Sequence, residues 1–234
     1  FHPDDIGNVR RALRGTVNMI PDQIEHDRIR MKKRDGEYSW YRGQYKAVFS
    51  PEGKAVRLIG TLTDISAQID REQELRHQAQ QDPLTDVYNR AGVKLINARL
   101  EQISRGILFM LDLDDFKFIN DTYGHAAGDK VLVAMGQILK DIFRTDDIVA
   151  RVGGDEFVAF LSGSDNASMA QEKAQELLDR VRELKLEGID TQISVSIGIA
   201  SAPTYGRTFE SLSASADEAM YEIKNGGKGG FALR

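Results

Sequence analysis

Hydrophobic and polar positions alternate with a period of two over much of the first 64 residues, which is typical of strands that bury one face. Three segments show this alternation: residues 24–32, 38–49 and 56–63. Asp35-Gly36 and Pro51-Glu52-Gly53 lie between them and are strong turn sequences. We also expect a short helix ahead of the first strand, capped by Asp4 or Asp5 and ending near Leu13. The pattern predicts a helix followed by three antiparallel strands, in a sheet that has no partner upstream.

The next segment, residues 65–81, is polar and contains neither Gly nor Pro. Its apolar residues follow a helical spacing but form a thin stripe: Ile65, Ile69, Leu75 and Ala79. A helix with such a narrow apolar face needs a partner to cover it. Asp82-Pro83 then interrupts the helix, because the residue before a proline disfavours helical backbone angles. We therefore expect a linker helix.

Residues 82–234 alternate between helical and strand-like periodicity, which predicts a second and larger domain. Helices are expected at about residues 84–103, 128–143, 166–184 and 209–224. Strands are expected at about residues 106–113, 148–152, 157–161, 194–200 and 230–233. The first of these strands is almost continuously apolar, as in strands that are buried on both faces. The order β-α-β-β-α-β predicts an α+β fold of the ferredoxin-like, split βαβ type.

Composition narrows the chemistry that this chain can perform. The sequence has no cysteine, which excludes disulfides, Cys–zinc sites and thiol nucleophiles. Its formal net charge of −5 argues against coating a DNA or RNA polymer. No apolar run approaches the roughly 18 residues needed to span a bilayer. We expect a cytoplasmic chain without a membrane segment of its own, and the sequence leaves open an anchor upstream.

Two acidic clusters carry the candidate chemistry. Asp112-Leu113-Asp114-Asp115 ends the buried strand, and Asp155-Glu156 lies in a predicted hairpin after Gly153-Gly154. In a split βαβ sheet the first strand lies beside this hairpin, so the carboxylates should converge at one end of the sheet. Converging carboxylates favour Mg²⁺ or Mn²⁺, which can activate a hydroxyl for in-line attack on a phosphate. The alternative is that each cluster is a solvated turn, and the paired glycines argue against it.

The hairpin also carries a recognisable motif. Gly153-Gly154 permits positive φ angles in a two-residue hairpin and leaves room for a substrate to approach the backbone. The stretch Arg151-Val152-Gly153-Gly154-Asp155-Glu156-Phe157 resembles the signature of the GGDEF family of diguanylate cyclases. Further stretches resemble motifs of that family in the expected order: residues 82–90, 112–121, Gly124-His125, Gly128-Asp129 and 216–224. The resemblance covers residues 82 to about 230.

This resemblance implies roles for individual residues. It implies that Asp112, the backbone carbonyl of Leu113 and Asp155 bind Mg²⁺ or Mn²⁺. It implies that Lys117 contacts the triphosphate. Glu156 or Asp155 would accept the proton of the ribose 3′-hydroxyl, and the sequence leaves that choice open. It also implies that Asn120 and Asp129 contact guanine and that Lys224 and Lys228 contact phosphate. His125 would line the guanine pocket, and the alternative is that it is an ordinary turn residue.

Two positions depart from the family pattern, namely Asp86, where glycine is usual, and Lys228, where arginine is usual. Lys228 keeps the charge but lacks the bidentate fork of arginine, so we expect a weaker hold on the triphosphate. Arg144 and Asp147 resemble the family's inhibitory R-x-x-D site, which implies feedback binding of the product cyclic di-GMP. The alternative for this pair is a surface ion pair. The sequence leaves two candidates for a second arginine of that site: Arg180 and Arg182.

The first 64 residues resemble the C-terminal half of a PAS sensor domain. The matching stretches are His2-Pro3-Asp4-Asp5 and residues 35–40 and 60–66. The resemblance implies a partial sensor that lacks much of its ligand pocket and exposes a sheet edge. Trp40 is expected in core or interface packing. Two histidines are expected in structural roles rather than as haem ligands: His2 and His26.

Together these resemblances imply three parts: a partial PAS domain (1–64), a signalling linker helix (65–81) and a GGDEF domain (82–234). They imply a diguanylate cyclase that condenses two GTP molecules into cyclic di-GMP and two pyrophosphates, with Mg²⁺ and as a homodimer. The alternative is a catalytically inactive module that binds cyclic di-GMP. The signal sensed by the PAS part stays open.

Overall fold

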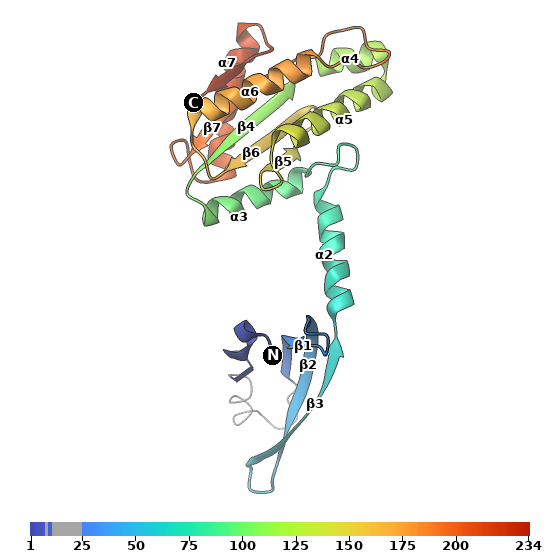
Figure 1. Ribbon diagram of the computed structural model, residues 1–234, viewed down its shortest axis with the longest axis vertical. Helices are drawn as coiled ribbons and strands as arrows, with labels where there is room; N and C mark the ends of the chain where they lie inside the picture. The colour runs from blue at the N-terminus through green and yellow to red at the C-terminus, as the bar shows by residue number, and fades with distance from the viewer. Residues whose placement is uncertain (8, 11–24) are drawn as a thin grey trace. The chain divides into compact units, whose positions relative to one another are not determined.

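The computed structural model describes residues 1–7, 9–10 and 25–234, without the side chains of residues 25–27, 58 and 73–78. The described chain divides into two compact units, Phe1–Gln78 and Ala79–Arg234. Each unit has a β-sheet of its own (Figure 1).

The first unit is built on an antiparallel sheet. Its described strands are β1 (Glu25–Lys32), β2 (Tyr38–Phe49) and β3 (Ala55–Asp64), in the order β1-β2-β3. Gly36 in the first turn has φ +95°, a backbone angle that few residues other than glycine adopt. A 3-10 turn, η1 (Pro3–Asp5), precedes the sheet. The three strands agree with the sequence pattern, whereas the helix expected to end near Leu13 runs outside the described residues.

Asp5 holds the start of the chain against β1. Its carboxylate accepts hydrogen bonds from Arg30 N at 2.8 Å and from the Arg30 guanidinium at 2.7 and 3.0 Å. The side-chain hydrogen bond from Arg30 is the main cause that lowers the pKa of Asp5 to about 2. The Arg30 guanidinium also lies 5.1 Å from the centre of the Trp40 ring. Trp40 is therefore a packing residue, as expected.

Helix α2 (Ser66–Gln80) follows β3 and agrees with the linker helix expected at residues 65–81. Two contacts fix its start to the first sheet. Ser66 Oγ accepts a hydrogen bond from Trp40 N at 3.0 Å, and the Ile65 side chain is buried. The helix therefore begins as a direct continuation of β3.

Among the described residues, the sheet of the second unit has five strands in the order β5-β6-β4-β7-β8. These are β4 (Gly106–Leu113), β5 (Ile148–Arg151), β6 (Glu156–Ser162), β7 (Val195–Ala202) and β8 (Phe231–Leu233). The central strand β4 is antiparallel to both β6 and β7, and β8 is parallel to β7. Without β8, this is the strand order of the ferredoxin-like, split βαβ fold that the sequence predicts.

Helices cover both faces of this sheet (Figure 1). They are η3 (Arg90–Val93), α3 (Lys94–Gln102), α4 (Phe116–Tyr123), α5 (His125–Ile142), α6 (Ala167–Arg182) and α7 (Phe209–Gly226). Phe109 and Leu111 of β4 pack with α5 and α6, whereas Leu108 and Met110 pack with α3 and α7. The alternation along β4 therefore places Asp112 on the face of α3 and α7. None of the described helices is long and apolar enough to cross a membrane.

The helix expected at residues 84–103 starts later than predicted, and that part of the prediction was wrong. Asp82 Oδ1 accepts hydrogen bonds from Thr85 N at 3.0 Å and Thr85 Oγ1 at 2.7 Å, so residues 82–85 form a turn. Asp86 follows with φ +55°, outside the helical region. Side-chain hydrogen bonds of this kind compete with helix formation. They hold this segment in a turn although its apolar residues have a helical spacing.

Tyr88 then joins the edge of the second sheet. Its backbone N donates to Val149 O at 2.9 Å, and Arg151 N donates to Tyr88 O at 2.7 Å. These two hydrogen bonds form a parallel bridge between Tyr88 and Ala150 of the edge strand β5. The segment between α2 and η3 therefore lies along β5 instead of forming a helix.

Helix α4 was missing from the sequence prediction, which placed a single helix from residue 128 onward. Gly124 separates α4 from α5 and has φ +85°. The glycine ends the first helix and allows the chain to turn at once into the second. The two helices pack against each other beyond the end of β4.

Candidate active site

The two acidic clusters meet at one end of the second sheet. In the register of β4 and β6, Asp112 lies directly opposite Glu156. Leu113 N donates a hydrogen bond to Asp155 O at 3.2 Å. The buried strand β4 and the hairpin before β6 therefore bring their acidic residues side by side, as the split βαβ topology predicts.

Lys224 on α7 adds a positive charge to this acidic group. Its Nζ lies 2.8 Å from Asp112 Oδ2. Asp112 is half-buried, and burial raises the pKa of its carboxyl; the negative charges of Asp155 and Asp114 act in the same direction, and Lys224 opposes them. The structure therefore brings Asp112, Asp155 and Lys224 into one site.

Glu156 lies directly over Gly153. A Cβ atom at Gly153 would come within 3.2 Å of Glu156 Cβ and nearer still to the Glu156 carboxylate, so a larger residue there would displace that carboxylate. A Cβ atom at Gly154 would meet only open space. Neither glycine has a φ angle in the left-handed range, so the hairpin does not use the positive φ angles that glycine permits. Glycine at position 153 thus lets the Glu156 carboxylate lie against the hairpin backbone.

Burial raises the pKa of Glu156, and the charges of Asp112, Asp155 and Asp217 raise it further. Asp217 lies on α7, and burial raises its pKa as well. We did not single out Asp217 from the sequence as a site residue. The signal was its position seven residues before Lys224, because about two helical turns place both side chains on one face.

The other two aspartates of the first cluster hold the surrounding loops. Asp114 is buried and accepts three hydrogen bonds of 2.7 to 3.0 Å, from Ser194 Oγ, Ser196 Oγ and Gly229 N. Asp115 has φ +54° and accepts a hydrogen bond from Lys228 Nζ at 2.7 Å. That hydrogen bond is the main cause that raises the pKa of Lys228. Lys228 therefore lies against the loop between β4 and α4.

Helices α4 and α5 carry the remaining substrate candidates. Lys117 and Asn120 are three residues apart on α4, and His125 and Asp129 are four apart on α5, so each pair shares one face of its helix. A Cβ atom at Gly128 would collide with Asn120 Oδ1, so the glycine lets Asn120 lie against α5. The side chains of Lys117, His125 and Asp129 are exposed and make no hydrogen bond or ion pair with another described residue.

The donor atoms at the end of β4 suit a hard divalent cation. Asp112, Asp155 and the carbonyl of Leu113 would supply oxygen ligands only, which Mg²⁺ and Mn²⁺ prefer. Within the described part of the chain, no three His, Asp or Glu side chains are grouped to hold a metal ion.

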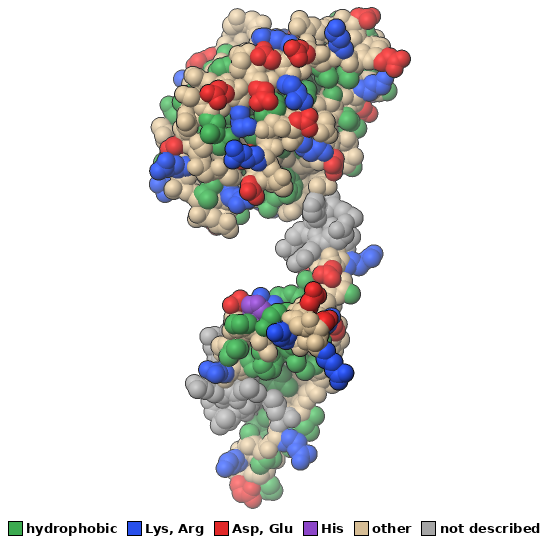
Figure 2. Space-filling view, in the orientation of Figure 1, with side chains coloured by type: hydrophobic (Ala, Val, Ile, Leu, Met, Phe, Trp, Pro, Cys, Tyr) green, Lys and Arg blue, Asp and Glu red, His purple; other side chains and the backbone are tan. Residues whose placement is uncertain are grey.

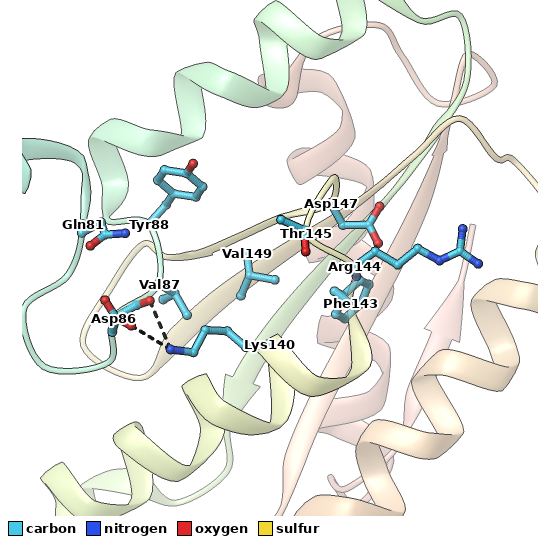
Figure 3. Close-up of a pocket in the computed structure, with 10 residues that line it drawn as sticks. All are labelled: Gln81, Asp86, Val87, Tyr88, Lys140, Phe143, Arg144, Thr145, Asp147 and Val149. Carbon is cyan, nitrogen blue, oxygen red and sulfur yellow. Dashed lines mark hydrogen bonds and ion pairs between the residues drawn. The ribbon is translucent and has the colours of Figure 1, made fainter. Parts of the chain in front are cut away.

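The Arg144–Asp147 turn connects α5 to β5. Asp147 accepts hydrogen bonds from Arg144 N and Ser162 N, both at 3.0 Å. The Arg144 guanidinium has no partner among the residues that the structure describes. Figure 3 shows it pointing away from a neighbouring cavity of about 280 Å³, which the Lys140–Asp86 ion pair (2.9 Å) borders. Of the two predicted product-site residues, Arg144 is free and Asp147 holds the turn.

Both candidates for a second arginine of that site have partners elsewhere. Arg180 pairs with a carboxylate of α5 at 2.8 Å, and Arg182 donates to Gly229 O at 2.8 Å. Arg99 on α3 instead contacts the R-x-x-D turn, where it donates to Asp146 O at 3.4 Å. No pattern in the sequence indicates this contact, because it joins residues 47 positions apart.

Charges on the surface of the second unit are mixed in sign. On the face drawn in Figure 2, Lys and Arg side chains are interspersed with Asp and Glu side chains. That face therefore has no basic stripe of the kind that coats a nucleic-acid polymer.

These observations define the class: an α+β domain of split βαβ topology with a Gly-Gly-Asp-Glu hairpin at the end of its sheet. The chain belongs to the GGDEF-domain family of diguanylate cyclases, whose family model matches residues 79–230. A PAS-fold family model matches residues 1–62. Both resemblances noted in the sequence are confirmed, and members of the GGDEF family generally use a divalent metal.

The chain is 34% identical over 194 residues to the cyclic di-GMP phosphodiesterase PdeR of Escherichia coli, covering 80% of this chain and 29% of PdeR. It is 37% identical over 140 residues to diguanylate cyclase A of Treponema denticola, covering 59% of this chain and 38% of that protein. It therefore spans about a third of the length of these curated relatives.

Among solved structures, the chain resembles the coiled coil and GGDEF domain of DgcB from Caulobacter crescentus in complex with c-di-GMP. The TM-score is 0.64 at 27% sequence identity, and the match covers 72% of this chain and 94% of that one. The shared architecture extends over almost the whole DgcB fragment.

Proposed function

We propose that this chain is a diguanylate cyclase that joins two GTP molecules into cyclic di-GMP and releases two pyrophosphates. One observation carries the proposal: Asp112 lies opposite Glu156 in the sheet, with Lys224 Nζ 2.8 Å from the Asp112 carboxylate. In the proposed site these carboxylates would bind a metal ion and accept the hydroxyl proton, and the Lys224 ammonium group beside them would contact a phosphate. The proposed parts are a partial PAS domain (1–64), a signalling linker helix (65–81) and the cyclase domain (82–234).

In the proposed reaction, the ribose 3′-oxygen of one GTP attacks the α-phosphorus of the other. A phosphodiester bond forms, the bond to the β-phosphate breaks, and pyrophosphate leaves with the electron pair. The hydroxyl proton passes to Glu156 or Asp155, which both lie at the site. Bound at Asp112, Leu113 and Asp155, Mg²⁺ or Mn²⁺ would neutralise charge on the phosphate oxygens. A second such step closes the ring.

Residues of α4 and α5 are proposed to hold the nucleotide. The Asp129 carboxylate can accept hydrogen bonds from guanine N1–H and N2–H₂, and Asn120 can complement the remaining edge. His125 shares a helix face with Asp129 and would line the same pocket. The proposed phosphate contacts are Lys117, Lys224 and Lys228.

The symmetric product requires two bound GTP molecules, so we propose that two copies face each other in a homodimer, with α2 as the lever between sensor and cyclase. Feedback by cyclic di-GMP is proposed at the R-x-x-D turn. A free guanidinium can stack on guanine or hold a phosphate. Arg144 therefore carries this proposal, and Asp147 shapes the turn that presents it.

Incubating the chain with GTP and Mg²⁺ over a range of protein concentrations tests the proposal. We expect cyclic di-GMP, identified by mass, and a rate per chain that rises as dimers form. Chelation by EDTA should stop synthesis, and added Mg²⁺ or Mn²⁺ should restore it. A dimeric preparation that binds cyclic di-GMP but makes none would support the inactive binding module instead.

A further inference from the structure

The loop between α7 and β8, residues 227–229, has an unusual backbone, and we call it the lysine loop. Gly227, Lys228 and Gly229 have φ angles of +124°, +66° and +62°, all in the left-handed range. The end of a helix commonly needs only one such residue, and Gly227 fills that role, because its amide donates to Ile223 O of α7. Lysine rarely adopts this conformation, since its Cβ atom meets a backbone carbonyl oxygen. Contacts from other elements therefore hold Lys228 in it.

Asp114 provides one of these contacts. It is only 6% exposed, and its Oδ2 accepts hydrogen bonds from Gly229 N at 3.0 Å and from Ser194 Oγ at 2.8 Å. Its Oδ1 accepts a hydrogen bond from Ser196 Oγ at 2.7 Å. The two serines, at the start of β7, orient the carboxylate, and the carboxylate in turn holds the amide of the loop.

Arg182, the last residue of α6, holds the other polar group of the Gly229 backbone. Its Nη2 donates to Gly229 O at 2.8 Å. Its Nη1 lies 3.9 Å from Asp179, which is about one turn earlier on the same helix. The amide and the carbonyl of Gly229 are thus bound by side chains from two different elements.

These hydrogen bonds fix the backbone on both sides of Lys228. The peptide group before it is held because Lys228 N donates to Ile223 O at 3.1 Å. The peptide group after it is held because Gly229 N donates to Asp114. The angles φ and ψ of Lys228 lie between these two planar groups, so the direction in which its side chain leaves the backbone is fixed.

This direction takes Lys228 to the acidic end of β4. Its Nζ lies 2.7 Å from Asp115 Oδ1, and Lys224 Nζ lies 2.8 Å from Asp112 Oδ2. One ammonium group from α7 and one from the lysine loop therefore flank the proposed site. The Lys228 side chain is 42% exposed, so a flexible backbone would let it sample many positions. Ordering it would then reduce the affinity for a phosphate.

We propose that Arg182 and Asp114 are positioning residues for nucleotide binding, which hold the lysine loop so that Lys228 is presented to the triphosphate. Neither residue contacts the nucleotide, and both act through the backbone of Gly229. This inference rests on the proposed cyclase function, in which Lys228 contacts a phosphate. It gives Arg182 a role in substrate binding that is separate from the proposed product site.

Hydrogen exchange on the intact chain, without nucleotide, tests whether these residues hold the loop. Arg182→Met keeps the apolar stem of the side chain and removes the donor to Gly229 O. We expect the amide of Gly229 to exchange about fivefold faster in this variant. Arg180→Met is the matched control, because Arg180 is equally accessible on α6 but pairs with Asp141 at 2.8 Å. Equal exchange in the two variants would overturn the proposal.

Binding of an unreactive nucleotide tests the consequence for the site. The probe is a GTP analogue with a methylene bridge between the α- and β-phosphates, added with Mg²⁺ in a calorimetric titration. Lys228→Met should raise its Kd about tenfold, because this change removes a charged hydrogen bond to phosphate, and Arg182→Met should raise it about fivefold. Arg180→Met should leave the Kd within about twofold.

Combining the two changes separates positioning from direct binding. The double variant of Arg182→Met and Lys228→Met should bind the analogue no more weakly than Lys228→Met alone, since Arg182 acts only through Lys228. An undiminished effect of Arg182→Met in the Lys228→Met background would overturn the proposal, because Arg182 would then act on the nucleotide independently.

Two changes at Asp114 separate its hydrogen bonds from its charge. In Asp114→Asn the amide oxygen can accept from Gly229 N and Ser194 Oγ, and the amide nitrogen can donate to Ser196 Oγ, so the Kd should stay within about threefold. Asp114→Leu is similar in size but has no acceptor, and it should raise the Kd about tenfold. Equal losses would attribute the effect to charge and contradict the role in holding the loop. If Asp114→Leu does not fold, the Arg182→Met series decides.

The outcomes also distinguish this inference from the cyclase proposal. An intact chain that binds the analogue with a Kd dependent on Arg182, yet makes no dinucleotide, would contradict the cyclase and retain the positioning role. An active chain whose Arg182→Met variant binds the analogue as tightly as the intact chain would overturn the positioning role alone. An intact chain that does not bind the analogue would contradict both, because Lys228 would have no phosphate to contact.

Discussion

Arg151 and Asp82 form a largely buried ion pair in which Nη1 and Oδ1 are 3.2 Å apart. The same guanidinium donates to Gly154 O at 2.7 and 3.1 Å. One side chain therefore links the turn that follows α2 to the hairpin that carries Asp155 and Glu156. A displacement of that turn would reach the hairpin through Arg151.

We predict that removing either partner destabilises the second unit. Asp82→Asn and Arg151→Gln should each lower the free energy of unfolding by about 1–3 kcal/mol, because each leaves a partly buried polar group unpaired. In a double-mutant cycle the coupling should be about 1 kcal/mol. Urea unfolding measures both quantities. The exposed Arg105–Asp165 pair is the control, with an expected coupling near zero. Additive effects of the first pair would contradict the link.

The two hairpin glycines should respond differently to alanine. Gly153→Ala places a methyl group against Glu156, so it should lower the stability of the second unit by about 1–3 kcal/mol and move the Glu156 carboxylate. Gly154→Ala meets open space and should leave stability within about 0.5 kcal/mol. Thermal unfolding of both variants compares them directly. Equal losses would show that backbone freedom, not room for Glu156, is required.

The Asp5–Arg30 pair should make the first unit sensitive to acid. The pKa of Asp5 falls from 3.8 to about 2 because of its hydrogen bonds to Arg30. A lowered pKa stabilises the fold above pH 3.8, and this contribution disappears as the pH falls toward 2. The intact chain should therefore exceed Asp5→Asn in stability above about pH 4, and the difference should vanish near pH 2. Chemical unfolding at several pH values measures this. Asp70→Asn, at an exposed position of α2, is the surface control.

Arg144→Ala should relieve inhibition by cyclic di-GMP and leave the initial rate within about twofold, because the free guanidinium is remote from Asp112 and holds no part of the fold. Initial rates at increasing product concentration provide the measurement. Asp147→Ala is a poorer probe, since it also removes hydrogen bonds to Arg144 N and Ser162 N. Unchanged inhibition in Arg144→Ala would dismiss the R-x-x-D site.

Lys228→Arg should strengthen the hold on the triphosphate. Arginine can keep the contact to Asp115 and offer a second donor to phosphate. We expect KM for GTP to fall about threefold with kcat nearly unchanged, as measured by steady-state kinetics. The control Lys185→Arg, on the surface, should leave KM as it is. A higher KM in Lys228→Arg would indicate that lysine at this position is already the better ligand.

The hydrophobic periodicity predicted the helices and strands well where the preference of the local sequence agrees with the packing of the folded chain. The helix expected at residues 166–184 is α6, and the Asn166 side chain caps it by accepting hydrogen bonds from Ser168 N and Met169 N. The continuously apolar β4 is the central strand, buried on both faces. The predicted split βαβ topology also placed Asp112 beside the hairpin, where it pairs with Glu156.

The features that were predicted wrongly or not at all depend on contacts between residues far apart, which the pattern of hydrophobic and polar residues does not reveal. Residues 82–89 have helical apolar spacing, but Asp82 makes its hydrogen bonds to Thr85 and Arg151 instead. Arg99 reaches the R-x-x-D turn only through packing of α3. Gly153 lies against the Glu156 side chain, a contact that no φ preference predicts. Each miss depends on a contact made in three dimensions.

The backbone bridge at Tyr88 also protects the protein from aggregation. An edge strand with unpaired amide and carbonyl groups is a template for uncontrolled growth of a sheet with other chains. Tyr88 occupies those groups on Val149 and Arg151, at the outer edge of β5. The segment that connects α2 to the second unit thus also terminates the sheet, and we expect a fragment that began after Asn89 to expose this edge and to lose solubility.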